Sequence, residues 1–157
     1  MDAFAFGLRN GKITTPPLES VLYFGSPRNA AGKLSVMNEG LVHSGDNLTG
    51  VGAGDDEVIQ VDFSKLPADV DEVYICVNIY DAVNRRQNFG MVNNAYIRVM
   101  DASAGTEFCR YDLSEDYSSF TGILAGKVYK HGTEWKFQAV GQGVNGDINA
   151  IINPYQN

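Results

Sequence analysis

The chain has 157 residues, a formal net charge of −7 and a pI of about 4.7, with 44% hydrophobic and 20% charged residues. Such a composition is typical of a single globular domain, here spanning residues 1–157 and large enough to bury a core. The acidic balance argues against nucleic acid and anionic membranes as partners, because phosphate binding needs clustered Lys and Arg. No apolar run approaches the ~20 residues that cross a bilayer, so no membrane span is expected.

Short apolar runs separated by Gly, Asn and Pro dominate the chain and indicate β-strands. The first run alternates over residues 3–8 and meets Asn10-Gly11, which is the strongest short-range signal for a hairpin. A second hairpin is expected around His131-Gly132-Thr133. The strands predicted in this way cover residues 3–8, 20–24, 57–63, 71–80, 95–100, 106–113, 123–130 and 134–140.

Two of these runs indicate how the strands are arranged. The run 57–63 places Ile59, Val61 and Phe63 on one face and leaves Asp62 on a polar face. The run 71–80 is apolar on both faces, which is typical of a central strand in a two-layer structure. About eight short strands at regular spacing predict an all-β fold, a two-sheet β-sandwich. Only two short helical turns are expected, at 64–69 and 113–117, the second with acids in its first turn.

The reactive side chains give little sign of catalysis. Cys76 and Cys109 lie in strand-like runs at a spacing that matches no zinc motif, so we expect buried free thiols in a reducing cytoplasm. His43 and His131 are the only histidines, and neither lies in a recognisable nucleophile or metal motif. The start of the chain shows no secretory signal. The sequence therefore predicts a protein that is not an enzyme.

An acidic, glycine-rich stretch lies in a region without cations. No Lys or Arg occurs between Lys33 and Lys65, and residues 45–57 contain four carboxylates and four glycines within thirteen residues. Adjacent anions repel one another, and hard oxygen ligands on a pliable loop are what Ca²⁺ prefers. On composition alone the stretch is equally compatible with a calcium site and with a solvated acidic turn. It is not an EF-hand, because Leu48 and Val51 stand at that motif's third and sixth positions.

Two other segments have two interpretations each. Asp81 ends the run 71–80 and could ligate a metal or cap the following turn. The tail, residues 145–155, is compatible with a last strand or with a segment that docks elsewhere.

Several separate segments of the chain resemble the TerD family, the tellurium-resistance and stress-response proteins of bacteria. Their order and spacing agree over roughly residues 2–143. The segments that carry the resemblance are 43–50 running on to 54–57, then 62–67, 79–82 with 87–90, 110–117 and 134–143.

The resemblance implies a cytoplasmic, non-enzymatic stress protein that binds one or two Ca²⁺ ions and acts through protein partners. Such proteins are encoded in bacteria and in phages or other mobile elements. The acidic loop of the family falls on residues 46–57, with Asp81 and Asn88 adjoining it. The metal ligands expected from the resemblance are Asp2, Asp46, Asn47, Asp55, Asp56, Glu57, Asp81 and Asn88.

Two departures from the family pattern carry expectations of their own. Relatives usually begin with a further strand and a longer acidic run, of which only Asp2 is present here, so one expected ligand is missing. The lost strand would leave a sheet edge and Phe4 and Phe6 uncovered, which favours self-association or a partner. The alternative function is therefore a structural or assembly protein, such as a phage or filament component. Val51 and Ala53 replace more polar residues and should weaken calcium binding.

Overall fold

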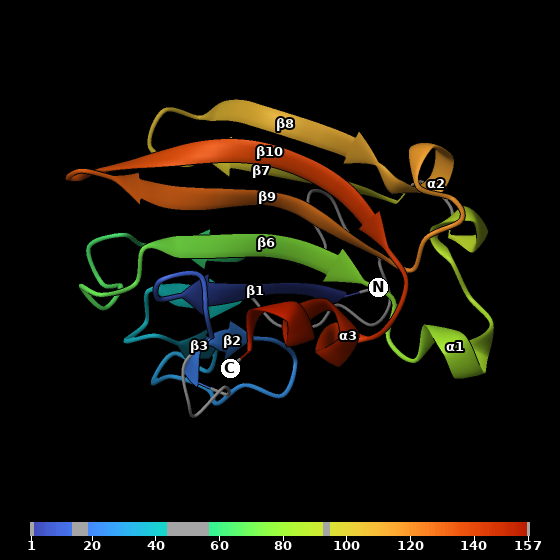
Figure 1. The fold of residues 1–157 in the computed structure, drawn as a ribbon, viewed down its shortest axis with the longest axis horizontal. Coiled ribbons are helices and arrows are strands. Elements are labelled where there is room, and N and C mark those ends of the chain that lie inside the picture. The colour runs from blue at the N-terminus through green and yellow to red at the C-terminus, as the bar shows by residue number, and fades with distance from the viewer. Residues whose placement is uncertain (1, 14–18, 44–56, 93–94, 157) are drawn as a thin grey trace. The chain divides into compact units, whose positions relative to one another are not determined.

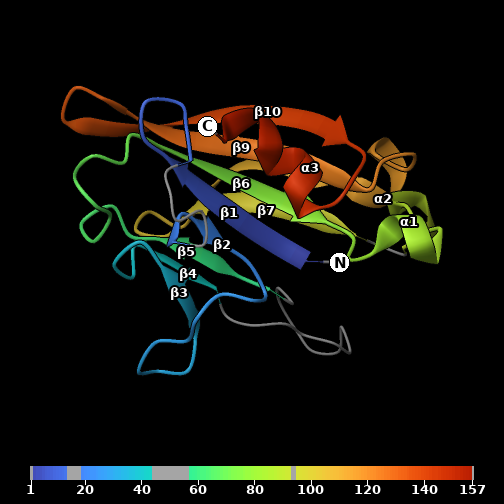
Figure 2. The same ribbon diagram turned by 60° about the horizontal axis from the view of Figure 1, so that its bottom comes forward.

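The structure is a computed structural model that describes residues 2–13, 19–43, 57–92 and 95–156. These residues form a mostly β structure with several antiparallel sheets and a few short helices (Figures 1 and 2). The strands are β1 (Asp2–Leu8), β2 (Val21–Leu22), β3 (Leu34–Val36), β4 (Leu41–His43), β5 (Ile59–Val61), β6 (Glu72–Asn78), β7 (Tyr96–Asp101), β8 (Thr106–Asp112), β9 (Gly122–His131) and β10 (Glu134–Val144). The helices are α1 (Ala82–Arg85), η2 (Phe89–Met91), α2 (Leu113–Asp116), α3 (Ile148–Ile152) and η3 (Asn153–Tyr155).

The chain divides into two compact units, which are described separately. The N-terminal unit contains residues 2–73 and 155–157. In it β1 pairs antiparallel with β2, and β4 lies between β3 and β5 in a second antiparallel sheet. Phe4, Phe6 and Leu41 are buried in the core of this unit, and the ring of Phe6 contacts Tyr155 with centroids 5.3 Å apart.

The C-terminal unit contains residues 74–154. In it β9 lies between β10 and β6, and β7 pairs with β8 in a separate two-stranded sheet. The rings of Phe108 on β8 and Phe137 on β10 stack with centroids 5.0 Å apart, so the two sheets touch through aromatic side chains. Leu113 and Ile123 are fully buried in this unit.

Both predicted hairpin turns are confirmed. Asn10 and Gly11 adopt positive φ angles of 52° and 76°, as a two-residue hairpin turn with an Asn-Gly pair requires. Arg9 and Lys12 on either side exchange backbone hydrogen bonds of 2.9 and 3.1 Å. Gly132, between β9 and β10, has φ of 68°.

Other expectations for the first half of the chain are corrected. The runs 20–24 and 57–63 are strands for only two and three residues, and β3 and β4 were not predicted. Because β5 ends at Val61, Asp62 opens a turn and Phe63 is exposed, and 64–69 forms turns with no helix. The Asp62 carboxylate accepts hydrogen bonds from the Ser64 backbone and hydroxyl, which stabilises the turn against continued strand.

Three further expectations concern Phe4 and Phe6, the two cysteines and the tail. Phe4 and Phe6 are fully buried, whereas they were expected to lie uncovered at a sheet edge. Cys76 is buried and free as predicted, whereas Cys109 is free but only half-buried. The tail forms α3 and η3, with no strand. The Asp147 side chain accepts from the Ala150 amide at 2.8 Å and caps α3, which explains why a helix starts there.

Candidate metal site

The structure describes half of the predicted ligands. Asp46, Asn47, Asp55 and Asp56 lie outside the described residues, and no structural statement is made about them. The described ligands are Asp2 and Glu57 in the N-terminal unit, and Asp81 and Asn88 in the C-terminal unit. Within the described ranges, no three His, Cys, Asp or Glu side chains form a group that could hold a metal ion.

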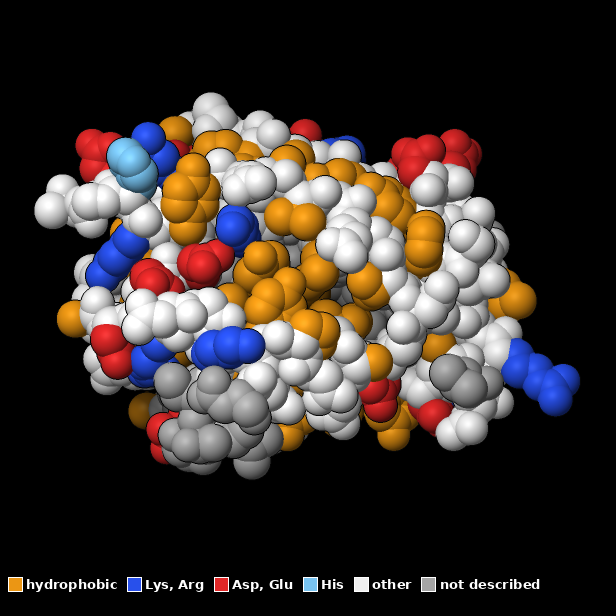
Figure 3. Space-filling model, in the orientation of Figure 1, with side chains coloured by type: hydrophobic (Ala, Val, Ile, Leu, Met, Phe, Trp, Pro, Cys, Tyr) orange, Lys and Arg blue, Asp and Glu red, His pale blue; other side chains and the backbone are white. Residues whose placement is uncertain are grey.

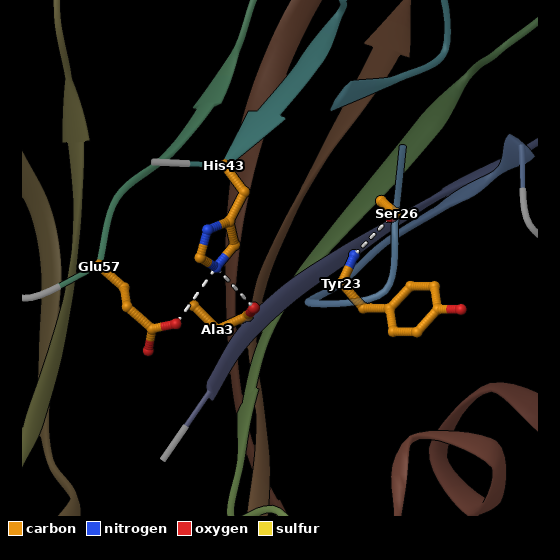
Figure 4. A network of polar contacts seen from close by, with 5 residues as sticks. All are labelled: Ala3, Tyr23, Ser26, His43 and Glu57. Atoms are coloured by element: carbon orange, nitrogen blue, oxygen red, sulfur yellow. Dashed lines mark hydrogen bonds and ion pairs between the residues drawn. The ribbon is translucent and has the colours of Figure 1, made fainter. Parts of the chain in front are cut away.

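A buried histidine contacts Glu57 at the end of the acidic stretch. His43 is the last residue of β4, and its side chain is only 2% exposed. Its Nε2 atom lies 3.3 Å from Oε1 of Glu57 and 3.1 Å from the carbonyl oxygen of Ala3 in β1 (Figure 4). The Glu57 side chain is 12% exposed. One ring nitrogen therefore joins three segments of the N-terminal unit.

The chemistry of these partners assigns the proton on the ring. A backbone carbonyl oxygen and an ionised carboxylate accept hydrogen bonds and cannot donate them. The Nε2 atom of His43 must therefore carry the hydrogen that the Ala3 carbonyl accepts, and Oε1 of Glu57 lies 3.3 Å from the same nitrogen. Buried polar groups are nearly always paired in this way, because an unpaired group would lose its hydrogen bonds to water.

The strand alternation explains why His43 faces β1. Leu41 and His43 both point to the buried side of β4, while Val42 between them is half-exposed. His43 pairs with Leu34 of β3 and with Ile59 of β5, so its backbone is held on both sides. Sequence reasoning set His43 aside because it fits no metal or nucleophile motif. The only signal was its place directly before the acidic stretch.

Asp2 is the sequence neighbour of Ala3, which contacts the same histidine as Glu57. Asp2 is 9% exposed and immediately precedes Ala3, whose carbonyl contacts the same Nε2 atom as Glu57. Asp2 and the Glu57 side chain are thus each largely shielded from water. Carboxylate oxygens are the hard donors that Ca²⁺ takes, and the contact to His43 uses only one of the two Glu57 oxygens. Carboxylate oxygens are therefore the right type of donor for calcium, but the described residues alone form no group that could hold the ion.

Asp81 has the structural role that was its second interpretation. It is exposed, its φ is +54°, and its Oδ1 accepts from Nδ2 of Asn84 at 2.8 Å. Its carbonyl accepts from the Arg85 amide at 3.0 Å, so Asp81 caps the turn that starts α1. Asn88 is half-buried at the start of η2, where its carbonyl accepts from the Met91 amide and its side chain makes no cap hydrogen bond.

Exposed acids also gather on α2, where Figure 3 shows a group of acidic side chains. Glu115 and Asp116 lie in the first turn, as predicted. The N-cap is Asp112, which accepts from the Glu115 amide at 3.1 Å. Ser114 instead donates to the Val92 carbonyl and accepts from the Ala95 amide. These contacts give the group a helix-capping role.

A family model and two known proteins each match nearly the whole chain. A family model described as "TerD domain" matches residues 1–155. Stress response protein SCP2 of Bacillus subtilis (strain 168) is 44% identical over 155 residues, which cover 98% of this chain and 73% of that protein. Tellurium resistance protein TerD of Serratia marcescens is 39% identical over 156 residues, covering 99% of this chain and 77% of that protein.

A shorter match and a solved structure extend the comparison. General stress protein 16U of Bacillus subtilis is 48% identical over 118 residues, but the chain spans only 61% of its length. The crystal structure of a homologue of telluride resistance protein (TerD) from Streptomyces coelicolor A3(2) has a TM-score of 0.75 at 18% identity. That match covers 96% of this chain and 82% of the solved chain, and it indicates a shared fold.

Proposed function

Because this chain belongs to the TerD family, we propose that it is a calcium-binding module of bacterial stress response or tellurite resistance. It acts through protein partners and catalyses no reaction. The stress-response and tellurium-resistance roles come from the names of relatives that match nearly all of this chain. The proposal for calcium rests on the Glu57 carboxylate, which lies 3.3 Å from the buried His43 at the end of the acidic stretch, and on the buried Asp2, whose neighbour Ala3 contacts the same ring nitrogen through its carbonyl.

The proposed ligands include Asp2, Glu57 and residues of the acidic stretch. Glu57 and Asp2 would supply oxygen ligands that are already shielded from water, and residues 46–56 would supply the remaining oxygens. Calcium would neutralise carboxylates that lack cations in the surrounding sequence, since no Lys or Arg occurs between Lys33 and Lys65. One or two ions are proposed, as the resemblance implies.

The proposed architecture is a β-sandwich in a reducing cytoplasm. Within the N-terminal unit the β1–β2 pair packs against the sheet β3–β4–β5, and within the C-terminal unit β8 packs against β10. Such face-to-face contacts are typical of sandwiches. Both cysteines are free, which supports a reducing compartment. In the described part of the chain, no helix is long and apolar enough to cross a membrane.

Thermal unfolding with calcium and with a chelator tests the proposal. Calcium at 100 times its dissociation constant should add about 2.7 kcal/mol to the free energy of unfolding, by mass action. Magnesium should substitute poorly, because it demands a tight octahedron that a glycine-rich loop does not impose. An unchanged melting temperature between excess calcium and chelator would contradict the proposal. Affinity capture with and without calcium then tests whether binding recruits protein partners.

A further inference from the structure

We propose that Asn10-Gly11 is a site of spontaneous deamidation, and that the fold protects Asn145-Gly146, the second Asn-Gly pair of the chain, from the same reaction. Asparagine is a thermolabile residue, and a following glycine leaves its backbone nitrogen unshielded, because glycine has no Cβ atom. The reaction needs only water, so it is independent of the calcium site proposed above. The two pairs differ in what holds the glycine nitrogen.

Deamidation begins when the backbone nitrogen of Gly11 attacks the side-chain carbonyl carbon of Asn10. The new bond closes a succinimide ring, and the side-chain amide nitrogen leaves as ammonia with the proton that the backbone nitrogen has lost. Water then adds to one of the two ring carbonyl carbons, the bond from that carbon to the nitrogen breaks, and the nitrogen regains a proton. The product is aspartate or isoaspartate, according to which bond breaks. An amide and water are thus converted to a carboxylate and ammonium.

Both reacting groups of Asn10-Gly11 are accessible at the tip of the first hairpin. Asn10 is exposed, and, leaving aside the chain neighbours, no heavy atom lies within 4 Å of the position that a Cβ on Gly11 would take. The turn's hydrogen bonds belong to Arg9 and Lys12, whereas among the described residues the Gly11 nitrogen and the Asn10 side chain have no hydrogen-bond partner. Attack requires Asn10 to rotate out of its left-handed conformation, with φ of 52°. Exposed hydrogen bonds at a chain reversal open at low free-energy cost, so this rotation is accessible.

The attacking nitrogen of Asn145-Gly146 is already engaged. The Gly146 amide donates to Oγ1 of Thr121 at 3.0 Å, and the Thr121 hydroxyl lies 3.5 Å from the Gly146 carbonyl oxygen, to which it donates. Thr121 is itself held, because its amide donates to the Val144 carbonyl at 3.1 Å. On the other side, a Cβ on Gly146 would meet the Cβ of Ala150 in α3 at 2.7 Å. Breaking one typical hydrogen bond before the attack slows the reaction about 2- to 12-fold.

Deamidation at Asn10 changes both the charge and the backbone of the first hairpin. The Asn10 amide donates to Oδ2 of Asp71 at 3.4 Å, so the new carboxylate forms on a residue that already contacts a carboxylate. Like charges repel, which weakens this contact. The aspartate product can keep the turn, because Asp-Gly suits the same turn type as Asn-Gly. Isoaspartate lengthens the backbone of the two-residue turn and should disrupt the pairing of Arg9 with Lys12.

Peptide mass spectrometry of the full chain, aged at mildly alkaline pH in oxygen-labelled water, tests the proposal. Parallel samples in urea give the rate of each pair without the fold, so each native rate is divided by its urea rate. This ratio should be at least about 2- to 12-fold lower at Asn145 than at Asn10, as the extra hydrogen bond requires. Label should enter Asn10 in the native protein, with isoaspartate and aspartate separated by chromatography.

Two valine variants then test the hydrogen bond itself. Thr121→Val keeps the side-chain shape without the hydroxyl, and it should raise the native rate at Asn145 about 2- to 12-fold and leave the rate at Asn10 unchanged. The matched control is Thr133→Val, which should change neither rate, because among the described residues the Thr133 hydroxyl makes no hydrogen bond. A folded Thr121→Val protein with the wild-type rate at Asn145 would contradict the protective role of Thr121.

The wild-type comparison decides the proposal even if Thr121→Val does not fold. Equal native-to-urea ratios at the two pairs, or a lower ratio at Asn10, would overturn it. Native protein that gains no label at Asn10, while the urea sample does, would overturn it as well. Calcium enters none of these measurements, so a failure of the proposed calcium site leaves their result unchanged.

Discussion

The Tyr117 hydroxyl donates a hydrogen bond to the backbone carbonyl of Gly141 across 2.8 Å. Tyr117 is the C-terminal cap of α2, and Gly141 lies where the register of β10 against β9 shifts between Ala139 and Gln142. Gly141 has φ of 63°, and a side chain there would meet the ring of Tyr111. Burial, with the charge of Asp116, raises the pKa of Tyr117, so the hydroxyl keeps the proton that it donates. The bond therefore ties α2 to the β-bulge of the last strand.

Removing that hydroxyl should destabilise the C-terminal unit. We expect Tyr117→Phe to lower the free energy of unfolding by about 0.5–1.5 kcal/mol, the net contribution of a typical hydrogen bond. Urea unfolding measures the change. Tyr129→Phe is the matched control, because among the described residues the Tyr129 hydroxyl has no hydrogen-bond partner and its ring still faces Lys127. Equal losses in the two variants would contradict a special role for the bond to Gly141.

Substitutions of Asp56 and Asp62 should differ in how much they change calcium affinity. Asp56→Asn removes a predicted ligand and should weaken calcium binding about tenfold or more, since ligand charge tunes affinity. Asp62→Asn should change affinity little, because the Asp62 carboxylate is engaged by the Ser64 amide at 3.0 Å and hydroxyl at 2.6 Å. Calorimetric titration compares the two. Equal affinities would remove Asp56 from the ligand set.

Two Asp–Ser turns should titrate below the ordinary range. The hydroxyl of Ser64 lowers the pKa of Asp62 from its usual 3.8, and that of Ser103 lowers the pKa of Asp101 from the same value. A depressed folded pKa contributes stability above the unfolded pKa of 3.8, and this contribution is lost as the pH falls through the folded pKa. The turns should therefore loosen only below about pH 4.

Removing each serine hydroxyl checks this assignment. Ser64→Ala should raise the pKa of Asp62 toward 3.8 and leave Asp101 unchanged, and Ser103→Ala should do the reverse. Carboxyl-resolved NMR titration follows both groups in each variant, so each serves as the control for the other. A pKa that stays low after its serine is removed would show that another contact causes the shift.

The two thiols should differ in reactivity. Burial raises the pKa of Cys76 well above 9.0 and, less strongly, that of Cys109, and the thiolate is the reactive form. Cys109 is half-buried, whereas Cys76 is inaccessible, so iodoacetamide should label Cys109 first. Peptide mass spectrometry measures the labelling at each site. In urea both thiols should react at similar rates, and earlier labelling of Cys76 in the native protein would contradict its burial.

Local chemistry in the sequence was enough to predict the hairpins and the turn-capping acids. Asn and Gly readily adopt the positive φ angles that a two-residue hairpin turn requires, so the turn residues alone are enough to predict a hairpin. Asn10, Gly11 and Gly132 have such angles in the structure. The family was also evident from the sequence, because its motifs lie in separate segments whose order is preserved. The helix at the tail could have been predicted from Asp147, which stands at the N-cap position before Ile148.

Only the tertiary structure determined what the buried polar residues do. His43 and Ala3 are 40 residues apart, and nothing in the spacing of either indicates that their atoms lie 3.1 Å from each other. The short strands β3 and β4 were missed because three residues carry too little alternation to separate a strand from a loop. Their pairing depends on hydrogen bonds between distant segments. The sequence determined which residues form turns, which segments alternate as strands and where the charges lie. Packing determined which of these residues meet, because burial pairs polar groups that are far apart in the chain.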